Sequence, residues 1–127
     1  SMSTITASNL NDGTTTVATT YVTNGSAKAW INLNGTGTIA ARDSLNISST
    51  TDVGNGYYRP NFASNMSSDT YTVSGSIIGS TSGYYYSFIT ADGGALTASS
   101  FDSEIIHYAG SRNDMTYVHF IIHGDLA

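Results

Sequence analysis

The stretch "AKAWINLNGTGTIAARDSLNISS", residues 27–49, decides the fold and contains the only tryptophan and the only lysine of the chain. Over residues 27–33, apolar side chains alternate with Lys28, Trp30 and Asn32. A period of two residues is that of a strand with one buried face, because successive side chains point to opposite sides of a sheet. This segment therefore predicts a half-buried β-strand.

A predicted hairpin follows this strand. Asn34 and Gly35 both tolerate positive φ, which predicts a two-residue turn and a second strand over residues 36–41. Arg42 and Asp43 interrupt the pattern before it resumes in "SLNISS", so we expect a bend or bulge there.

Similar segments recur along the chain, separated by Gly, Asn and Asp, which are typical of turns. Further strands are predicted over residues 14–23, 57–63, 70–78, 83–90, 101–109 and 115–123. Pro60 has no N–H to donate, so its strand is expected at a sheet edge or at a bulge. About eight to ten short strands, evenly spaced, predict an all-β fold, a single-domain antiparallel β-sandwich of the jelly-roll-like kind.

Ser, Thr, Asn and Gly make up 60 of the 127 residues, and only 10% of the chain is charged. Nine Tyr, four Phe and one Trp distinguish the chain from disordered sequences, which lack aromatic residues. The net charge of −5, with four Lys and Arg in all, argues against nucleic acid and anionic membranes as partners. No apolar run is long enough for membrane insertion, and the absence of cysteine excludes disulfides and thiolate metal sites.

The predicted domain covers residues 14–127. Residues 1–13 contain few apolar side chains, and Ser1 precedes Met2, so this segment is expected to be a flexible N-terminal arm or a tag remnant.

The sequence does not predict an enzyme. Most of the eight Asp residues lie in turns, where Asp caps its own backbone, and there is one Glu. No G-x-S-x-G motif supplies a nucleophile. We expect no cofactor.

Three tyrosines, Tyr84, Tyr85 and Tyr86, are the predicted binding residues, because exposed tyrosines with neutral polar neighbours suit glycans or protein surfaces. The alternative is that they pack in the core and at strand edges. Trp30 is expected to be a packing anchor or a subunit contact.

His119 and His123 lie four residues apart and share one strand face, with His107 on another predicted strand. A metal site built from these three is the alternative interpretation. The favoured one places them on the solvent face, because an H-x₃-H spacing on a strand lacks the register of helical zinc motifs.

The segment from "NGSAKAWINLNGTGTIAARDSLNISSTTDVGNGYY" to "NFASNMSSDTYTVSGS", residues 24–76, resembles a module of tailed-phage virion proteins. The features in common are Ala-Lys-Ala-Trp, Asn-Gly-Thr-Gly-Thr, a Gly-x-Gly-x-Tyr turn and an Asn-Phe strand. The chain departs from the module at Pro60, which interrupts a strand that is usually continuous.

The resemblance implies a non-enzymatic structural or adhesive protein of the virion, assembled in the host cytoplasm. Such a protein is expected in the tail or tail fibre, as a homotrimer that binds a host receptor, often a glycan, or neighbouring virion proteins. Two alternatives remain open at this point. One is a capsid decoration protein that stabilises the head, and the other is a small glycan-degrading enzyme.

Overall fold

The computed structural model describes residues 2–79, 86–90, 96–107 and 109–127, and over residues 86–90 it describes the backbone alone. The strands are β1 (Asn9–Asn11), β2 (Thr16–Ala18), β3 (Ala29–Asn34), β4 (Ala40–Leu45), β5 (Ile47–Gly54), β6 (Tyr57–Phe62), β7 (Thr72–Ile78), β8 (Tyr86–Thr90), β9 (Ser103–His107) and β10 (Tyr117–His123). One short helix, α1 (Thr19–Thr23), lies between β2 and β3. In this part of the chain, no helix is long and apolar enough to span a membrane.

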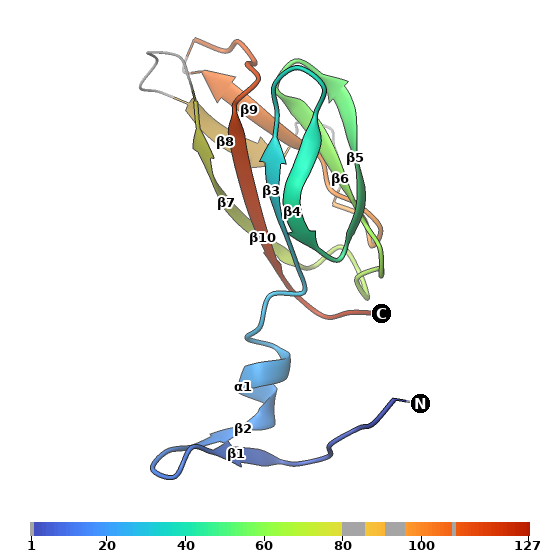
Figure 1. Cartoon of the computed structure of the whole chain (residues 1–127), viewed down its shortest axis with the longest axis vertical. Coiled ribbons are helices and arrows are strands. Elements are labelled where there is room, and N and C mark those ends of the chain that lie inside the picture. Colours follow the sequence, from blue (N-terminus) through green and yellow to red (C-terminus); the bar gives the residue numbers. More distant parts are fainter. Residues whose placement is uncertain (1, 80–85, 91–95, 108) are drawn as a thin grey trace.

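Eight of these strands form two four-stranded sheets, and every neighbouring pair within them is antiparallel. The front sheet has the order β4-β3-β10-β7, and the back sheet has the order β5-β6-β9-β8. Figure 1 shows the two sheets as layers, with the back sheet behind the front sheet. The predicted all-β class with antiparallel sheets is confirmed.

The inner faces of the two sheets enclose one hydrophobic core. Its buried members are Ala29, Ile31, Leu33, Tyr58, Phe62, Met66, Tyr71, Phe101, Ile105, Met115, Val118, Phe120 and Ile122. The rings of Phe101 and Phe120 meet edge to face, with their centroids 5.2 Å apart. Burying a large aliphatic or aromatic side chain contributes about 1.5–3 kcal/mol, so this core is the main source of stability.

The β3–β4 hairpin has the predicted strand alternation but not the predicted turn. Residues expected to face inward on β3 are buried, and those between them face outward. The connection spans residues 35–39, and the residue at positive φ is Gly37, at 62°. The prediction of a two-residue turn at Asn34-Gly35 is therefore wrong.

β4 contains the bulge that the sequence predicts at Arg42-Asp43. Asn32 pairs with Asp43 and Leu33 pairs with Ala41, so Arg42 is the extra residue between two successive pairs. The bulge turns the Arg42 side chain away from the regular alternation of the strand.

The sequence predicts that the strand containing Pro60 lies either at a sheet edge or at a bulge, and the edge position is wrong. β6 lies between β5 and β9, but its pairing with β9 covers only Tyr57 and Tyr58 before it is interrupted. The carbonyl of Pro60 accepts a hydrogen bond from the N–H of Phe101 at 3.3 Å. The backbone of Pro60 therefore faces the segment that leads into β9. The missing N–H therefore falls where the ladder is already broken, which is how an interior strand accommodates proline.

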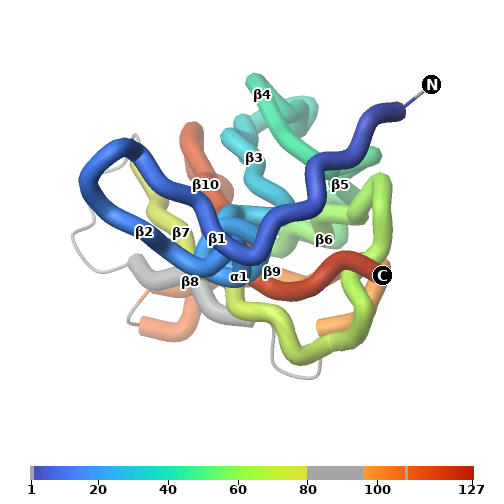
Figure 2. The backbone as a smooth tube through the Cα atoms, turned by 90° about the horizontal axis from the view of Figure 1, so that it is seen from below, coloured from blue at the N-terminus to red at the C-terminus, as the bar shows by residue number. Residues whose placement is uncertain are grey.

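The N-terminal segment, residues 2–26, lies outside both sheets. β1 and β2 form a hairpin in which Leu10 pairs with Val17, and α1 follows directly. Figure 1 shows this segment projecting beyond one end of the sheets, and Figure 2 views the molecule from that end. The predicted domain boundary at residue 13 falls inside the hairpin, and the sheets begin only at Ala29.

The predicted strand over residues 14–23 is wrong in its second half, which forms α1. Lys28 helps to end this helix, because its ammonium donates hydrogen bonds to the carbonyls of Thr23 and Ser26. A cation at the carbonyl end of a helix is favourable, since it meets the unpaired C=O groups there.

One buried hydroxyl joins three connecting segments at the opposite end of the sheets. The Tyr58 side chain is fully buried, and its hydroxyl lies 2.7 Å from the carbonyl oxygen of Gly35 and 2.9 Å from Oδ1 of Asp114. The same Oδ1 accepts the N–H of Gly56 at 2.7 Å. Burial, and then the hydrogen bond to Asp114, raise the pKa of Tyr58 above its ordinary value.

We expect Tyr58→Phe to lower the free energy of unfolding by about 1–3 kcal/mol, because it removes the hydroxyl that lies between the buried carbonyl of Gly35 and the carboxylate of Asp114. Urea unfolding at pH 7 measures this loss. Tyr117→Phe is the matched control, since the Tyr117 side chain is exposed on the outer face and should change stability by less than about 0.5 kcal/mol. Equal stability of the two variants would contradict the assigned role of the Tyr58 hydroxyl.

Candidate functional site

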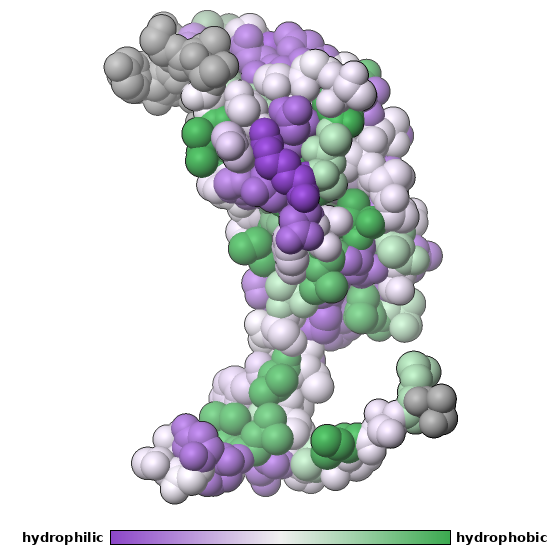
Figure 3. All heavy atoms as spheres, in the orientation of Figure 1, coloured by the Kyte–Doolittle hydropathy of each residue, from purple (hydrophilic) through white to green (hydrophobic). Residues whose placement is uncertain are grey.

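The outer face of the front sheet carries the candidate site. Strand register places its outward side chains in two rows that run across the strands. The apolar row consists of Leu45, Trp30 and Ile121, and the polar row consists of Asp43, Asn32, His119 and Ser76. Leu45 and Ile121 are 49% and 44% exposed, and Trp30 is half-buried. Figure 3 views this face, where hydrophilic residues gather over β3, β4 and β10 with hydrophobic residues beside and below them.

The face is hollowed at the point where the two rows meet β7. The hollow has a volume of about 550 Å³ and is lined by Trp30, Ile31, Asn32, Ser74, Gly75, Ser76, His119, Phe120 and Ile121. Ile31 and Phe120 direct their side chains into the core, so they form the floor with backbone atoms. A Cβ on Gly75 would lie 2.0 Å from the carbonyl oxygen of His119, so only glycine permits β7 to approach β10 this closely.

Arg42 is the bulged residue of β4, and its side chain orients polar groups on this face. Its guanidinium carbon lies 3.9 Å from the centroid of the Tyr117 ring, a cation–π contact. Its nitrogens donate to the carbonyl oxygen of Thr116 at 2.7 Å and to Oδ1 of Asn32 at 3.3 Å. Asn32 is thereby held through its amide oxygen, and its amide nitrogen makes no hydrogen bond to the described residues.

His119 borders the hollow and is only partly satisfied. Its Nδ1 lies 3.1 Å from the hydroxyl of Ser76, whereas its buried Nε2 makes no hydrogen bond within the described part of the chain. Neither Asp, Glu, Lys nor Arg is among the described residues that line the hollow. The site therefore offers one apolar wall and a set of hydrogen-bonding groups from Asn, Ser and His side chains.

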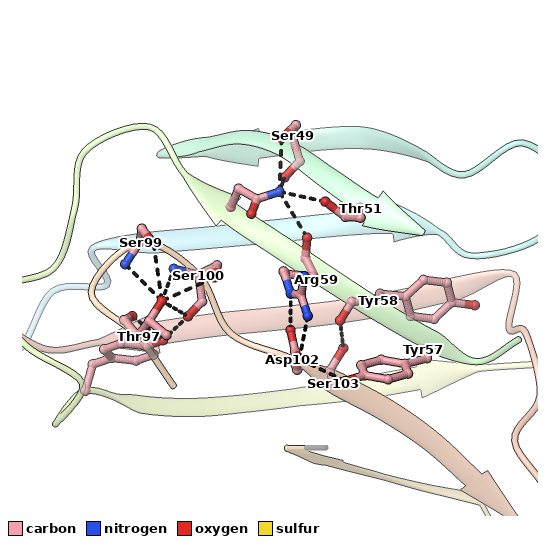
Figure 4. Close-up of polar contacts among 12 residues, drawn as sticks. Ser49, Thr51, Tyr57, Tyr58, Arg59, Thr97, Ser99, Ser100, Asp102 and Ser103 are labelled. Atoms are coloured by element: carbon pink, nitrogen blue, oxygen red, sulfur yellow. Dashed lines mark hydrogen bonds and ion pairs between the residues drawn. The ribbon is translucent and has the colours of Figure 1, made fainter. Parts of the chain in front are cut away.

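The outer face of the back sheet holds a second polar cluster. Arg59 donates two hydrogen bonds to the carboxylate of Asp102, at 2.5 and 2.9 Å, and the hydroxyl of Tyr57 donates to the same carboxylate at 2.9 Å. Figure 4 shows Arg59 and Tyr57 converging on Asp102. Two residues further along β9, the buried Glu104 forms an ion pair with Arg112, although the two groups are not aligned for a hydrogen bond.

This ionic cluster holds its carboxylates in place. The hydrogen bonds from Arg59 are the main cause that lowers the pKa of Asp102 below its ordinary value, so this carboxylate is ionised at neutral pH. The bond to Asp102 is also the main cause that raises the pKa of Tyr57. Each charged group of the cluster is paired with another group of the cluster, which favours a stabilising role for the cluster.

The structure separates the three histidines of the alternative metal site. His119 and His123 share the outer face of β10, whereas His107 lies on β9 in the back sheet. Across residues 2–79, 96–107 and 109–127, no group of three or more His, Asp or Glu residues is placed to hold a metal ion. The alternative metal site needs His107 on a strand next to β10, whereas the chain crosses from one sheet to the other between β9 and β10.

Trp30 lies outside the core, on the outer face, where it forms the wall of the hollow. The predicted binding residues Tyr84 and Tyr85 and the side chain of Tyr86 lie outside the described residues. Sequence reasoning did not single out Asn32, Ser74, Ser76 or Ile121. Alternation on each strand gives their faces, but the register that brings them together joins residues far apart in the chain.

Comparisons with protein-family models, with curated proteins and with solved structures find no match to this chain.

The lowered pKa of Asp102 predicts that its contribution to stability is present above the pKa of an unfolded aspartate, about 3.9, and is lost as the pH falls below that value. Asp102→Asn should therefore reduce stability at pH 7 and weaken the loss of stability between about pH 5 and pH 2. Urea unfolding across this range measures both effects.

Asp125→Asn serves as the control for this prediction. Its side chain is exposed and makes no hydrogen bond or ion pair with the described residues. An acid unfolding profile of Asp102→Asn that matches both the control and the parent would show that the Arg59–Asp102 pair does not stabilise the sheet.

Proposed function

We propose that this chain is a structural and adhesive domain of a tailed-phage virion, a tail or tail-fibre component that binds a host receptor or neighbouring virion proteins. The observation that carries the proposal is the hollowed outer face of the front sheet, where a half-buried tryptophan and exposed aliphatic side chains adjoin neutral polar groups. The resemblance of residues 24–76 to a virion module supports it. Surfaces that combine an aromatic anchor with a polar surround are typical of recognition sites.

The finer architecture in this proposal is an antiparallel β-sandwich made by the front and back sheets. Their shared core and face-to-face layers support it. The jelly-roll-like order is not carried into the proposal, because the consecutive strands β3 and β4, β5 and β6, and β8 and β9 pair as hairpins.

The proposal includes a homotrimer whose contacts involve the N-terminal segment. An isolated two-stranded hairpin is marginally stable in water, and β1 and β2 form one that lies outside both sheets. Leu10, Val17, Tyr21 and Val22 are 45%, 39%, 75% and 46% exposed within this segment. A second copy of the chain supplies the apolar surface that such a segment lacks.

The test of adhesion uses purified, fluorescently labelled protein and a panel of cultured bacterial strains. We expect saturable binding to the surface of at least one strain, and at least tenfold weaker binding by Trp30→Ala. Asn61→Ala, on the outer face of the back sheet, is the matched control and should bind as the parent does. Failure of the parent to bind any strain would contradict the adhesive function.

A capsid decoration protein is the second candidate, and the projecting N-terminal segment favours it, because such a segment is suited to clamp a neighbouring subunit. Purified expanded phage capsids test this candidate by co-sedimentation. Binding to capsids together with indifference to cells would support decoration. Release of reducing ends from any surface polysaccharide would support the glycan-degrading alternative against both.

Sedimentation equilibrium tests the oligomeric state. We expect the parent to behave as a trimer and Leu10→Asp, which places a charge on the hairpin face, to dissociate at least tenfold more readily. Thr14→Asp, in the β1–β2 turn, is the control and should remain a trimer. A monomeric parent would contradict this part of the proposal.

A further inference from the structure

The hollow of the front sheet has an apolar wall of a defined kind. Trp30 and Ile121 are cross-strand partners, so the indole and the aliphatic side chain stand side by side along one side of the hollow. A pyranose ring presents a face of C–H groups that matches such a wall, and Trp is suited to it because it offers a broad, rigid apolar surface.

Among the described residues, the other outward side chains that line the hollow are polar, and none of them is Asp, Glu, Lys or Arg. Ser74 and Ser76 contribute hydroxyls, each of which both donates and accepts hydrogen bonds. Asn32 has an amide nitrogen, and His119 a buried Nε2, without a partner among the described residues. The hydroxyls of a sugar supply donors and acceptors on the same group, so they suit the serine hydroxyls and the amide nitrogen of Asn32.

The absence of Asp, Glu, Lys and Arg among the described residues that line the hollow indicates which ligands suit it. The nearest cation, Arg42, is engaged with the Tyr117 ring, the Thr116 carbonyl and Asn32, and neither Asp43 nor Lys28 lines the hollow. A carboxylate or phosphate would therefore enter without a free cation to pair it, which is costly in a partly desolvated site. These features favour neutral hexoses over uronates and phosphorylated sugars.

Size favours a small ligand over a protein surface. A volume of about 550 Å³ lies within the range of about 300–1,000 Å³ typical of small-molecule sites. A specific protein interface needs about 800 Å² from each partner, whereas the apolar row exposes only three side chains.

We propose that this hollow binds a neutral hexopyranose unit of a cell-surface polysaccharide, with the sugar ring against Trp30 and its hydroxyls hydrogen-bonded to Asn32 and Ser76. The inference rests on the proposed adhesive function and names the ligand class for it.

Trp30 is the only tryptophan of the chain, so its fluorescence reports directly on this site. The probes are hexasaccharides of glucose, mannose, galactose and N-acetylglucosamine, with a hexamer of mannuronate as the charged comparison. We expect a saturable change in emission with at least one neutral probe and none with the mannuronate hexamer. Saturation by the charged probe alone, or by none of the neutral ones, would overturn the proposal.

Three variants locate the site. Ser74→Phe fills the hollow and keeps the Trp30 signal, and Trp30→Ala is followed by titration calorimetry; each should bind the neutral probe at least tenfold more weakly. Leu45→Ala removes a member of the apolar row that does not line the hollow, and should stay within twofold of the parent. Loss of cell binding in Leu45→Ala equal to that in Trp30→Ala would assign the face to a protein partner instead.

The adhesive function and the hexose site can be refuted independently, because cell binding and saccharide binding are measured in separate experiments. Protein that binds cells equally well after Ser74→Phe refutes the hexose site and leaves the adhesive function standing. Saccharide binding that Ser74→Phe abolishes, in a protein that binds no cell, supports the hexose site and refutes the adhesive function.

Discussion

The Tyr58 hydroxyl is the contact on which the geometry of both sheets depends. Its two acceptors lie 23 and 56 positions away in the chain, so one phenol joins segments that no local preference brings together. Gly35 follows β3, and its N–H donates to the carbonyl of Met115, just before β10, at 3.0 Å. A Cβ on Gly35 would lie 2.4 Å from the Tyr58 hydroxyl oxygen, which requires glycine at this position. A residue of the back sheet thus fixes the end at which β3 and β10 meet in the front sheet.

The arrangement of the proposed binding face depends on the register of the front sheet. Pairing of β3 with β10 sets Trp30 beside Ile121 and Asn32 beside His119, and pairing with β7 adds Ser76 to the polar side. A slip of one residue would turn every one of these side chains to the other face. The bulge at Arg42 adds the second element, because it places a guanidinium over Tyr117 and orients Asn32. Strand register therefore links the stability of the front sheet to the face that we propose for recognition.

Much of this architecture could be predicted from the sequence, and the misses have physical causes. Alternation identified the buried face of β3, and the broken pattern at Arg42-Asp43 identified the bulge. The two-residue turn at Asn34-Gly35 was wrong because Gly35 is held by the Tyr58 hydroxyl, which comes from the other sheet, and by the Met115 carbonyl. α1 was missed because β-branched residues favour strands, whereas these residues lie outside both four-stranded sheets and form a helix that ends at Thr23, where the Lys28 ammonium donates to the Thr23 carbonyl. The groups around the hollow were missed because side chains from β3, β7 and β10 meet only through non-local pairing.

Chemical shifts of the backbone amides and the tryptophan indole N–H in the labelled protein, recorded with and without a polysaccharide extracted from a bacterial strain to which it binds, test the central claim most directly. The account predicts changes at the Trp30 indole and at the amides of Asn32, Ser74 to Ser76 and His119 to Ile121, with the back sheet unchanged. Changes confined to the N-terminal segment or to the outer face of the back sheet would contradict it.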